Sequence, residues 1–237
     1  MRIAEGVEVL SVDGVWRGNP MRVHPVLLRE GDQIVLVDTA FPGQVEALRQ
    51  AIRACGVEIS QIRTVLLTHQ DLDHIGNAPA LVRESGAEVW AHPEEVPYIE
   101  GARTLLKFDP ARLSPEQREA LDPVLRDRPR VKVTRYLVDG ERLPLCGGVR
   151  VVHTPGHTPG HLSLFLELPR ILISGDALVV TDGQLRGPIP EFTPDRATAM
   201  ASVRKLADLE PDVVVCYHGG VYGPGAARRL RELAVGD

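Results

Sequence analysis

The sequence predicts an α/β protein made of one large domain over residues 1–237. Its length and a hydrophobic fraction of 43% are enough to bury a sizeable core. Short apolar runs rich in β-branched residues, such as 34–37 and 213–217, alternate with segments of helical periodicity, such as 43–54. The first pattern indicates strands and the second indicates helices. Their alternation along the chain favours the α/β class.

In the first half, strands are expected at 7–12, 23–28, 34–37, 64–68 and 87–91, with helices at 43–54, 77–84 and 93–99. Gly14 and the Glu-Gly-Asp turn at 30–32 separate the first three strands into a meander. Val45, Leu48 and Ile52 recur at the spacing of one helix face.

In the second half, strands are expected at 132–138, 143–145, 149–152, 162–166, 171–174 and 213–217, with helices at about 114–125, 193–206 and 225–233. Residues 101–130 are interpreted as a helical insertion on the outside of the core, because Ser114 is followed by Pro115 and by the capping-box partner Gln117. Such a long connection could also cover a pocket. The segment 179–193, rich in Gly and Pro, is expected to be irregular.

Charge and cysteine usage argue against several classes of protein. The 27 Lys+Arg against 32 Asp+Glu give a net charge of −5, whereas nucleic-acid binding draws on clustered basic charge. Cys55, Cys146 and Cys216 are scattered and odd in number, so neither a disulfide framework nor a cysteine zinc site is indicated. The first residues lack the apolar core of a signal peptide, and no run approaches the roughly 20 apolar residues of a membrane helix. We therefore expect a soluble, cytoplasmic protein with no nucleic-acid or membrane partner.

The stretch 68–74, Thr-His-Gln-Asp-Leu-Asp-His, concentrates potential metal ligands directly after an apolar run: His69, Asp71, Asp73 and His74. A strand would alternate them between two faces, and a helix would spread them around its circumference. A tight turn at the end of a strand could direct all four to one point. Imidazole and carboxylate together are the ligand mixture of zinc, iron and manganese sites. The alternative is a polar loop whose Asp residues form turns and cap the next helix.

A second histidine-rich stretch, 153–161, repeats His-Thr-Pro-Gly twice and ends on a third histidine. Pro followed by Gly suits the central positions of a type II turn, where Gly accepts a positive φ. Two such turns in tandem would hold His153, His157 and His161 at fixed spacing on a stiff loop. Spacing alone does not choose which of the three would bind a metal.

Four apolar strands, ending near Leu67, Val152, Ile173 and Cys216, are each followed closely by a His or an Asp. Open α/β sheets gather ligands at the carboxyl edge of their strands, so four such placements indicate one common site. The candidates are His69, Asp71, Asp73, His74, one of the three turn histidines, Asp176 and His218. This set is enough for two metal ions with positions open to water, the catalytic pattern. Asp38 directly follows strand 34–37. It would either orient a metal ligand without binding the metal itself or cap a loop.

In these spacings and in its order of strands, the sequence resembles the metallo-β-lactamase superfamily of metallohydrolases over nearly the whole chain. The resemblance implies a sandwich of two mixed β-sheets flanked by helices, with the site at one edge. The family signature His-x-His-x-Asp-His, a Thr-Pro-Gly-His turn, an Asp and a final His match this sequence at His69, Asp73, His74, His157, Asp176 and His218. The match selects His157 among the turn histidines and leaves His153 and His161 as neighbours, with His161 and Asp38 expected to support the ligands.

The sequence departs from the signature at Asp71, where the family has its second histidine. By analogy, His69, Asp71, His157 and Asp176 would hold one metal, while Asp73, His74, Asp176 and His218 would hold the other, with Asp176 bridging. Zinc is the first expectation for both divalent ions. A carboxylate in place of an imidazole adds a negative charge and a harder ligand, which moves the preference towards iron or manganese. Alternatively, Asp71 points away and leaves the first site three-coordinate or empty.

The resemblance implies a metal-dependent hydrolase in which a hydroxide held between two metals cleaves a small ester, thioester, lactone or related substrate. Asp73 would orient this hydroxide and take its proton. The loops 98–108 and 185–192 are expected to form the pocket wall, and a homodimer is left open. One alternative is a di-iron redox protein acting on oxygen or a sulfur compound, because flavodiiron members of the superfamily carry a carboxylate at the position of Asp71. The other is a non-catalytic metal-binding module that kept the site.

Overall fold

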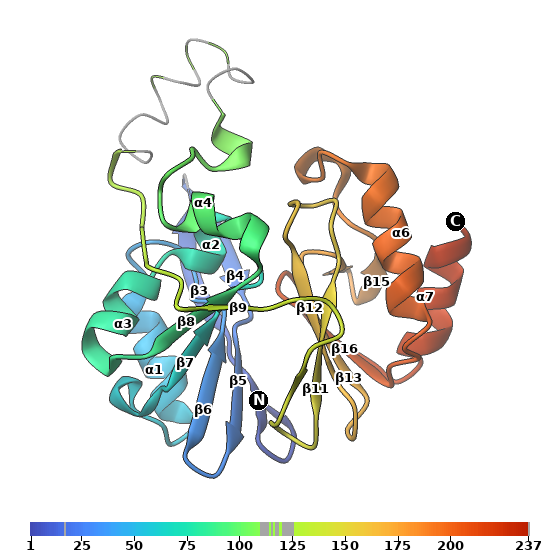
Figure 1. The fold of residues 1–237 in the computed structure, drawn as a ribbon. Helices are drawn as coiled ribbons and strands as arrows, with labels where there is room; N and C mark the ends of the chain where they lie inside the picture. The colour runs from blue at the N-terminus through green and yellow to red at the C-terminus, as the bar shows by residue number, and fades with distance from the viewer. Residues whose placement is uncertain (17, 110–113, 115, 117–118, 120–125, 237) are drawn as a thin grey trace.

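A computed structural model describes residues 1–16, 18–109, 114, 116, 119 and 126–236. Two β-sheets pack face to face, and helices cover the outer face of each sheet (Figure 1). The predicted αββα sandwich is therefore confirmed. None of the helices among the described residues has the length and apolar composition that a membrane crossing requires.

The first sheet has seven strands in the order β1-β2-β5-β6-β7-β8-β9. They are β1 (Arg2–Ala4), β2 (Val7–Val9), β5 (Val26–Glu30), β6 (Gln33–Val37), β7 (Thr64–Leu66), β8 (Glu88–Ala91) and β9 (Arg135–Tyr136). The strands from β1 to β6 pair antiparallel, and β6, β7, β8 and β9 pair in parallel. Val37 lies opposite Leu66 in the β6–β7 register, so the residues that follow these two strands emerge side by side.

The second sheet has six strands in the order β10-β11-β12-β13-β16-β17. They are β10 (Arg142–Leu143), β11 (Val149–His153), β12 (Leu162–Leu166), β13 (Ile171–Gly175), β16 (Val213–Cys216) and β17 (Gly220–Tyr222). Because β12 is antiparallel to both β11 and β13, and β13 is parallel to β16, the carboxyl ends of β11, β13 and β16 share one edge. Three of the four expected ligand-bearing strand ends thus meet in this sheet.

The part of the chain that the structure describes includes the helices α1 (Val45–Ala54), α2 (Leu72–Ile75), α3 (Ala78–Ser85), α4 (Val96–Ile99), α6 (Arg196–Ala207) and α7 (Ala226–Val235). It also includes the 3-10 turns η1 (Ile59–Gln61), η2 (Pro93–Glu95), η3 (Leu106–Phe108) and η5 (Pro190–Phe192). Helices α1 and α3 cover the first sheet, while α6 and α7 cover the second (Figure 1).

Three layers of buried apolar side chains hold the sandwich together. Leu48 of α1 packs with the outer face of the first sheet, and Val203 of α6 packs with that of the second. Between the sheets, Val35 and Leu66 pack with Val151 and their neighbours. Neighbouring residues of one strand enter different layers, as the period of two requires: Val35 faces the second sheet and Leu36 faces the helices.

Two expectations about local structure were wrong. The segment 179–193 is not irregular throughout, because β14 (Val179–Thr181) and β15 (Gln184–Arg186) form a hairpin. Its turn is Asp182-Gly183, with φ of 52° and 70°, and Asp-Gly is a strong signal for such two-residue turns. Gly14 does not separate strands either; it lies inside β3 (Val12–Trp16), which pairs with β4 (Asn19–Val23). The helix expected at 114–125 lies largely outside the described residues.

Candidate metal centre

The ends of β7, β11, β13 and β16 bring the predicted ligands together. Leu66 ends β7, and the chain then turns through His69 and Asp71 into the short helix α2, which carries Asp73 and His74. His157 lies in the loop between β11 and β12, Asp176 directly follows β13, and His218 lies between β16 and β17. The fold therefore brings the candidate ligands at these four strand ends together, as expected.

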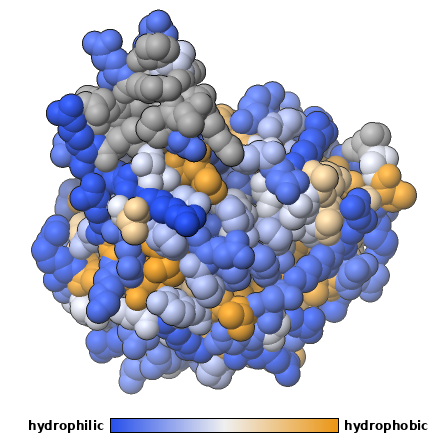
Figure 2. All heavy atoms as spheres, turned by 45° about the horizontal axis from the view of Figure 1, so that its top comes forward, coloured by the Kyte–Doolittle hydropathy of each residue, from blue (hydrophilic) through white to orange (hydrophobic). Residues whose placement is uncertain are grey.

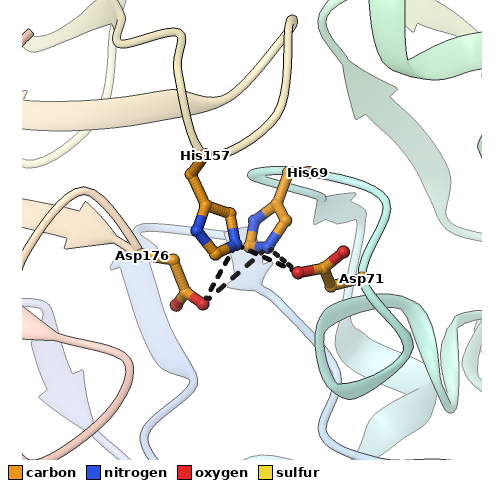
Figure 3. A group of neighbouring side chains, drawn as sticks. All are labelled: His69, Asp71, His157 and Asp176. Atoms are coloured by element: carbon orange, nitrogen blue, oxygen red, sulfur yellow. Dashed lines mark hydrogen bonds and ion pairs between the residues drawn. The ribbon is translucent and has the colours of Figure 1, made fainter. Parts of the chain in front are cut away.

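The first cluster comprises His69, Asp71, His157 and Asp176, whose side chains point toward one another (Figure 3). His69 Nε2 lies 3.2 Å from Asp71 Oδ2, and His157 Nε2 lies 3.0 Å from the same oxygen. Asp176 Oδ2 lies 3.3 Å from His157 Nε2 and 4.0 Å from His69 Nε2. Asp71 therefore faces the cluster, and the alternative in which it points away does not describe this structure.

The second cluster comprises Asp73, His74 and His218, and it adjoins the first through Asp176. Asp73 Oδ2 lies 3.1 Å from His218 Nε2 and 3.6 Å from His74 Nε2. Asp176 approaches the same two imidazoles, with Oδ1 3.3 Å from His74 Nε2 and Oδ2 3.5 Å from His218 Nε2. One carboxylate thus contacts imidazoles of both clusters, as a bridging ligand would.

The donor atoms fit a pair of small cations. Tetrahedral ligands at zinc distances are separated from one another by about 3.3–3.6 Å, and the contacts above scatter around this value. Among the described residues, the buried atoms His69 Nε2, His74 Nε2 and Asp176 Oδ1 have no hydrogen-bond partner. Two of them, His74 Nε2 and Asp176 Oδ1, face each other at 3.3 Å as an ion pair. Buried polar atoms are normally hydrogen-bonded, so three that are not, gathered at one point, suit a metal that would coordinate them.

Asp38 supports His74 from behind, as expected of an orienting residue. Its Oδ2 lies 2.9 Å from His74 Nδ1, while Thr68 donates to Oδ1 from its backbone N (2.9 Å) and to Oδ2 from Oγ1 (2.8 Å). The parallel pairing of β6 and β7 creates this contact, because Asp38 and Thr68 follow adjacent strand ends. A carboxylate on Nδ1 fixes the ring with Nε2 toward the cluster.

The histidine-rich loop separates its three imidazoles. His157 enters the first cluster, and His161 is fully buried beneath it. His161 Nδ1 lies 2.8 Å from Thr154 Oγ1, and its Nε2 accepts a hydrogen bond from the backbone N of Asp176 at 3.0 Å. His153 instead stacks on His92 with ring centroids 4.3 Å apart. His161 thus holds the backbone of Asp176, as the supporting role would require.

Only the first of the two expected type II turns is compatible with the observed backbone. Gly156 has φ of 127° and lies so close to α6 that a Cβ would overlap the backbone of Ala199. Gly160 does not have a positive φ; its place is set by Glu95, whose Oε1 accepts from Gly160 N at 2.7 Å. The expectation for the second turn was therefore wrong, since a contact with a distant carboxylate decides that conformation.

The electrostatics of the centre favour bound cations. Burial lowers the pKa of His69 to about 4, which leaves its ring neutral at pH 7. Burial also acts to lower the pKa of His218, but Asp176 and Asp73 outweigh it and raise that pKa to about 10. Burial acts to raise the pKa of Asp176, yet His218 and His74 hold it well below the usual range. An ionised, buried carboxylate surrounded by imidazoles attracts protons or metal ions to the same point.

Sequence reasoning missed several residues that build the centre. Tyr217 stacks its ring on His74 at 3.9 Å between centroids, accepts from Ala40 N and donates to the carbonyl oxygen of Asp73. Glu95 accepts from Gln70 N at 2.9 Å and from Gln70 Nε2 at 3.0 Å, which ties the 68–74 turn to the 153–161 loop. Burial raises the pKa of Glu95 to about 7. Tyr217 lies in the predicted strand 213–217, but nothing in the local sequence indicates its contact with His74 or the contacts of Glu95.

Comparison with known proteins establishes the family. Residues 18–218 match the model of the metallo-β-lactamase superfamily. The chain belongs to this superfamily. It is 31% identical over 226 residues to the probable metallo-hydrolase YflN of Bacillus subtilis, covering 86% of this chain and 83% of the relative. The hydroxyacylglutathione hydrolase GloC of Haemophilus influenzae is 30% identical over 187 residues, covering 76% and 77% of the two chains.

Among solved structures, a metallo-β-lactamase family protein from Thermus thermophilus superposes with a TM-score of 0.74 at 27% identity, covering 99% of this chain and 80% of that one. The superfamily fold and the clustered His and Asp side chains agree with each other. Together with metallo-hydrolase relatives, they support a metal-dependent hydrolase.

A pocket of about 330 Å³ opens onto both clusters of this superfamily member. Its polar lining residues are Asp71, Asp73, Lys107, His157, Asp176 and His218, and its apolar lining residues are Met21, Phe41, Leu72, Phe108, Leu178, Val179, Ile189 and Phe192. The expected wall segments 98–108 and 185–192 supply Lys107, Phe108, Ile189 and Phe192. Figure 2 shows the molecule with the top of Figure 1 turned toward the viewer. On this face, apolar surface is exposed among hydrophilic side chains.

Proposed function

We propose that this protein is a dinuclear metal-dependent hydrolase that cleaves a small thioester, ester or lactone. The observation that carries the proposal is that two donor clusters share Asp176 at the polar end of an apolar pocket. Two ions at one carboxylate suit hydrolysis better than a structural role, because structural sites are closed and this one faces a pocket. Thioesters come first because the H. influenzae relative is named a hydroxyacylglutathione hydrolase, and an acyl group on glutathione is held through sulfur.

In this proposal each cluster holds one ion. Zinc is the first candidate, and iron or manganese is the alternative, because the carboxylate of Asp71 is a harder ligand than imidazole. Bound divalent ions would supply Lewis acidity toward the acceptor oxygen and lower the pKa of water. Asp73, which faces His218 Nε2 and lines the pocket, would orient that water and take its proton. The apolar walls would exclude bulk water and bind the acyl or alkyl part of the substrate.

The experiment compares metal-free protein with protein reconstituted with zinc, manganese or iron on a panel of acyl thioesters, aryl esters and lactones. We expect turnover that requires metal and is lost in His218→Ala, because that variant removes a donor of the second cluster. His153→Ala is the matched control, since its ring stacks on His92 outside both clusters, and it should keep its activity. A fully metal-loaded protein that cleaves no member of the panel would contradict the proposal.

A di-iron redox protein is the second candidate, and one specific observation favours it: Asp71 directs a hard carboxylate oxygen into the first cluster. Metal analysis of protein purified without added metal separates the two candidates. Stoichiometric iron with an absorbance that changes on reduction would support the redox function and count against hydrolysis.

A further inference from the structure

One pocket-lining residue remains unexplained by the metal centre. Among the described residues that line the pocket, every polar side chain except Lys107 is a candidate metal ligand. Once ions occupy the clusters, those carboxylates and imidazoles are committed to them. Of the described lining residues, Lys107 then remains as the polar side chain available to a substrate, beside walls that are otherwise apolar.

The position of Lys107 is built by the metal-binding turn itself. Lys107 lies in η3, whose first residue, Leu106, donates its backbone N to Gln70 Oε1 at 2.9 Å. Gln70 separates His69 from Asp71, so the same turn that presents the ligands also anchors η3. Leu105 adds a fully buried side chain just before this turn. The ammonium group is thereby held against the first cluster, in contact with Asp71 and His157.

The contacts of the Lys107 ammonium group show which hydrogen-bond acceptors it would lose when a metal binds. Lys107 Nζ donates to Asp71 Oδ2 and lies 2.8 Å from His157 Nε2, with the ring of Phe192 centred 5.5 Å away. His157 Nε2 has one lone pair, so it cannot accept a hydrogen bond from Lys107 and bind a metal at the same time. An ammonium has three N–H donors and no acceptor, so a metal-loaded centre leaves Lys107 with donors to satisfy from the pocket side.

We propose that Lys107 binds a carboxylate of the substrate, so that the preferred substrate has an apolar body and one carboxylate near its scissile acyl bond. This inference rests on the proposed hydrolase function and deepens it. Phe108 and Phe192, which flank Lys107 on the pocket wall, would hold the apolar body. A carboxylate fits the ammonium better than a neutral polar group does, because it adds the attraction of opposite charges to the charge-assisted hydrogen bond that either partner would form. The pocket volume of about 330 Å³ suits a small molecule.

The test measures binding and hydrolysis separately on zinc-loaded protein. Binding is measured by calorimetry with 4-phenylbutanoate and with its uncharged amide. Hydrolysis is measured with the S-benzoyl thioester of 3-mercaptopropanoate and with the corresponding carboxamide. The variants are Lys107→Met, which keeps the length of the stem without the charge, and Lys107→Arg, which keeps the charge. Lys132→Met is the matched control, because Lys132 is exposed and does not line the pocket.

We expect wild-type protein to bind the carboxylate about ten- to a hundred-fold more tightly than the amide, the range expected for a hydrogen bond between charged groups. Lys107→Met should lose this preference with unchanged zinc content, while Lys107→Arg and Lys132→Met should keep most of it. In hydrolysis, the loss should appear in KM for the carboxylate substrate and spare the carboxamide.

Three results separate the possible failures. An equal preference in wild type and Lys107→Met would overturn the inference and leave the hydrolase intact. A fall in kcat on both thioesters would assign Lys107 to the reaction itself and also overturn it. If neither thioester is cleaved but the carboxylate preference depends on Lys107, the binding inference stands and the thioester assignment fails.

Discussion

Asp71 places a carboxylate oxygen between two imidazoles of the first cluster. Its Oδ2 lies within 3.2 Å of the Nε2 atoms of His69 and His157 and also accepts from Lys107. Burial acts to raise the pKa of Asp71, but Lys107 and His69 hold it well below the usual range. In the metal-free first cluster, the carboxylate therefore lies beside a cation that favours its ionised form.

Replacing Asp71 by His should shift the metal preference of the centre toward zinc, because a neutral imidazole is a softer ligand than a carboxylate. After reconstitution with equal zinc and ferrous iron, we expect the bound zinc-to-iron ratio to rise on the order of tenfold, the change that about 1.4 kcal/mol of differential binding gives. Metal analysis of the desalted protein measures the ratio. Asp32→His, on an exposed turn, is the control for an added histidine, and an unchanged ratio in Asp71→His would exclude Asp71 as a ligand.

At the scale of single elements, the loop after β6 packs tightly against the residues between α2 and α3. A Cβ on Gly76 would overlap the carbonyl oxygen of Ala40, and Asn77 Nδ2 donates to the carbonyl oxygens of Thr39 and Phe41. This close packing fixes the loop that begins at Asp38. Gly76 therefore allows the chain to approach the loop that carries Asp38, the residue that contacts His74 Nδ1.

Gly76→Ala should destabilise the protein by about 1–3 kcal/mol, the usual cost of overpacking a filled site, and should weaken metal binding because Asp38 must shift with its loop. Urea unfolding measures the stability and competitive titration measures the affinity. Gly187→Ala is the control, because its nearest contact would be Met200 Sδ at 3.9 Å. Loss of stability without any loss of affinity would show that Asp38 holds its place independently of Gly76.

The strands that carry the ligands could be predicted because each is a short apolar run followed by a polar residue. Strands β7, β11, β13 and β16 end within two residues of the expected positions. The β14–β15 hairpin also had a local signal, the Asp182-Gly183 turn, which composition alone obscured. The roles of Glu95 and Tyr217 could not be predicted, because their partners lie far away along the chain and local patterns carry no information about them. Lys107 stands out in sequence only as one charge between Leu106 and Phe108.

At the scale of the whole molecule, each cluster joins the two halves of the sandwich. His69 and Asp71 follow a strand of the first sheet, whereas His157 and Asp176 follow strands of the second. The second cluster is divided in the same way, with Asp73 and His74 from the first half and His218 from the second. Metal binding should therefore stabilise the association of the halves in addition to shaping the site.

Metal removal should lower the Tm of the entire molecule in one transition. An ion at about 1,000 times its Kd contributes about 4 kcal/mol, which corresponds to about 10 °C for a chain of this size. His69→Ala and His157→Ala should both lose most of this increment, although they lie on different sheets, while His153→Ala should keep it. Calorimetry with and without chelator measures each increment.

The increment should also depend on pH. In the metal-free protein, carboxylates raise the pKa of His218 to about 10 and that of His74 well above its usual value, against the effect of burial. The His218 ring therefore carries its second proton at neutral pH, and a metal must displace that proton, so binding strengthens as pH rises. The Tm increment should be smaller at about pH 6 than at about pH 8, since each displaced proton changes the apparent affinity by about tenfold per pH unit. An increment that is independent of pH, or that survives in both His69→Ala and His157→Ala, would mean that the metal binds elsewhere and that the shared centre does not join the sheets.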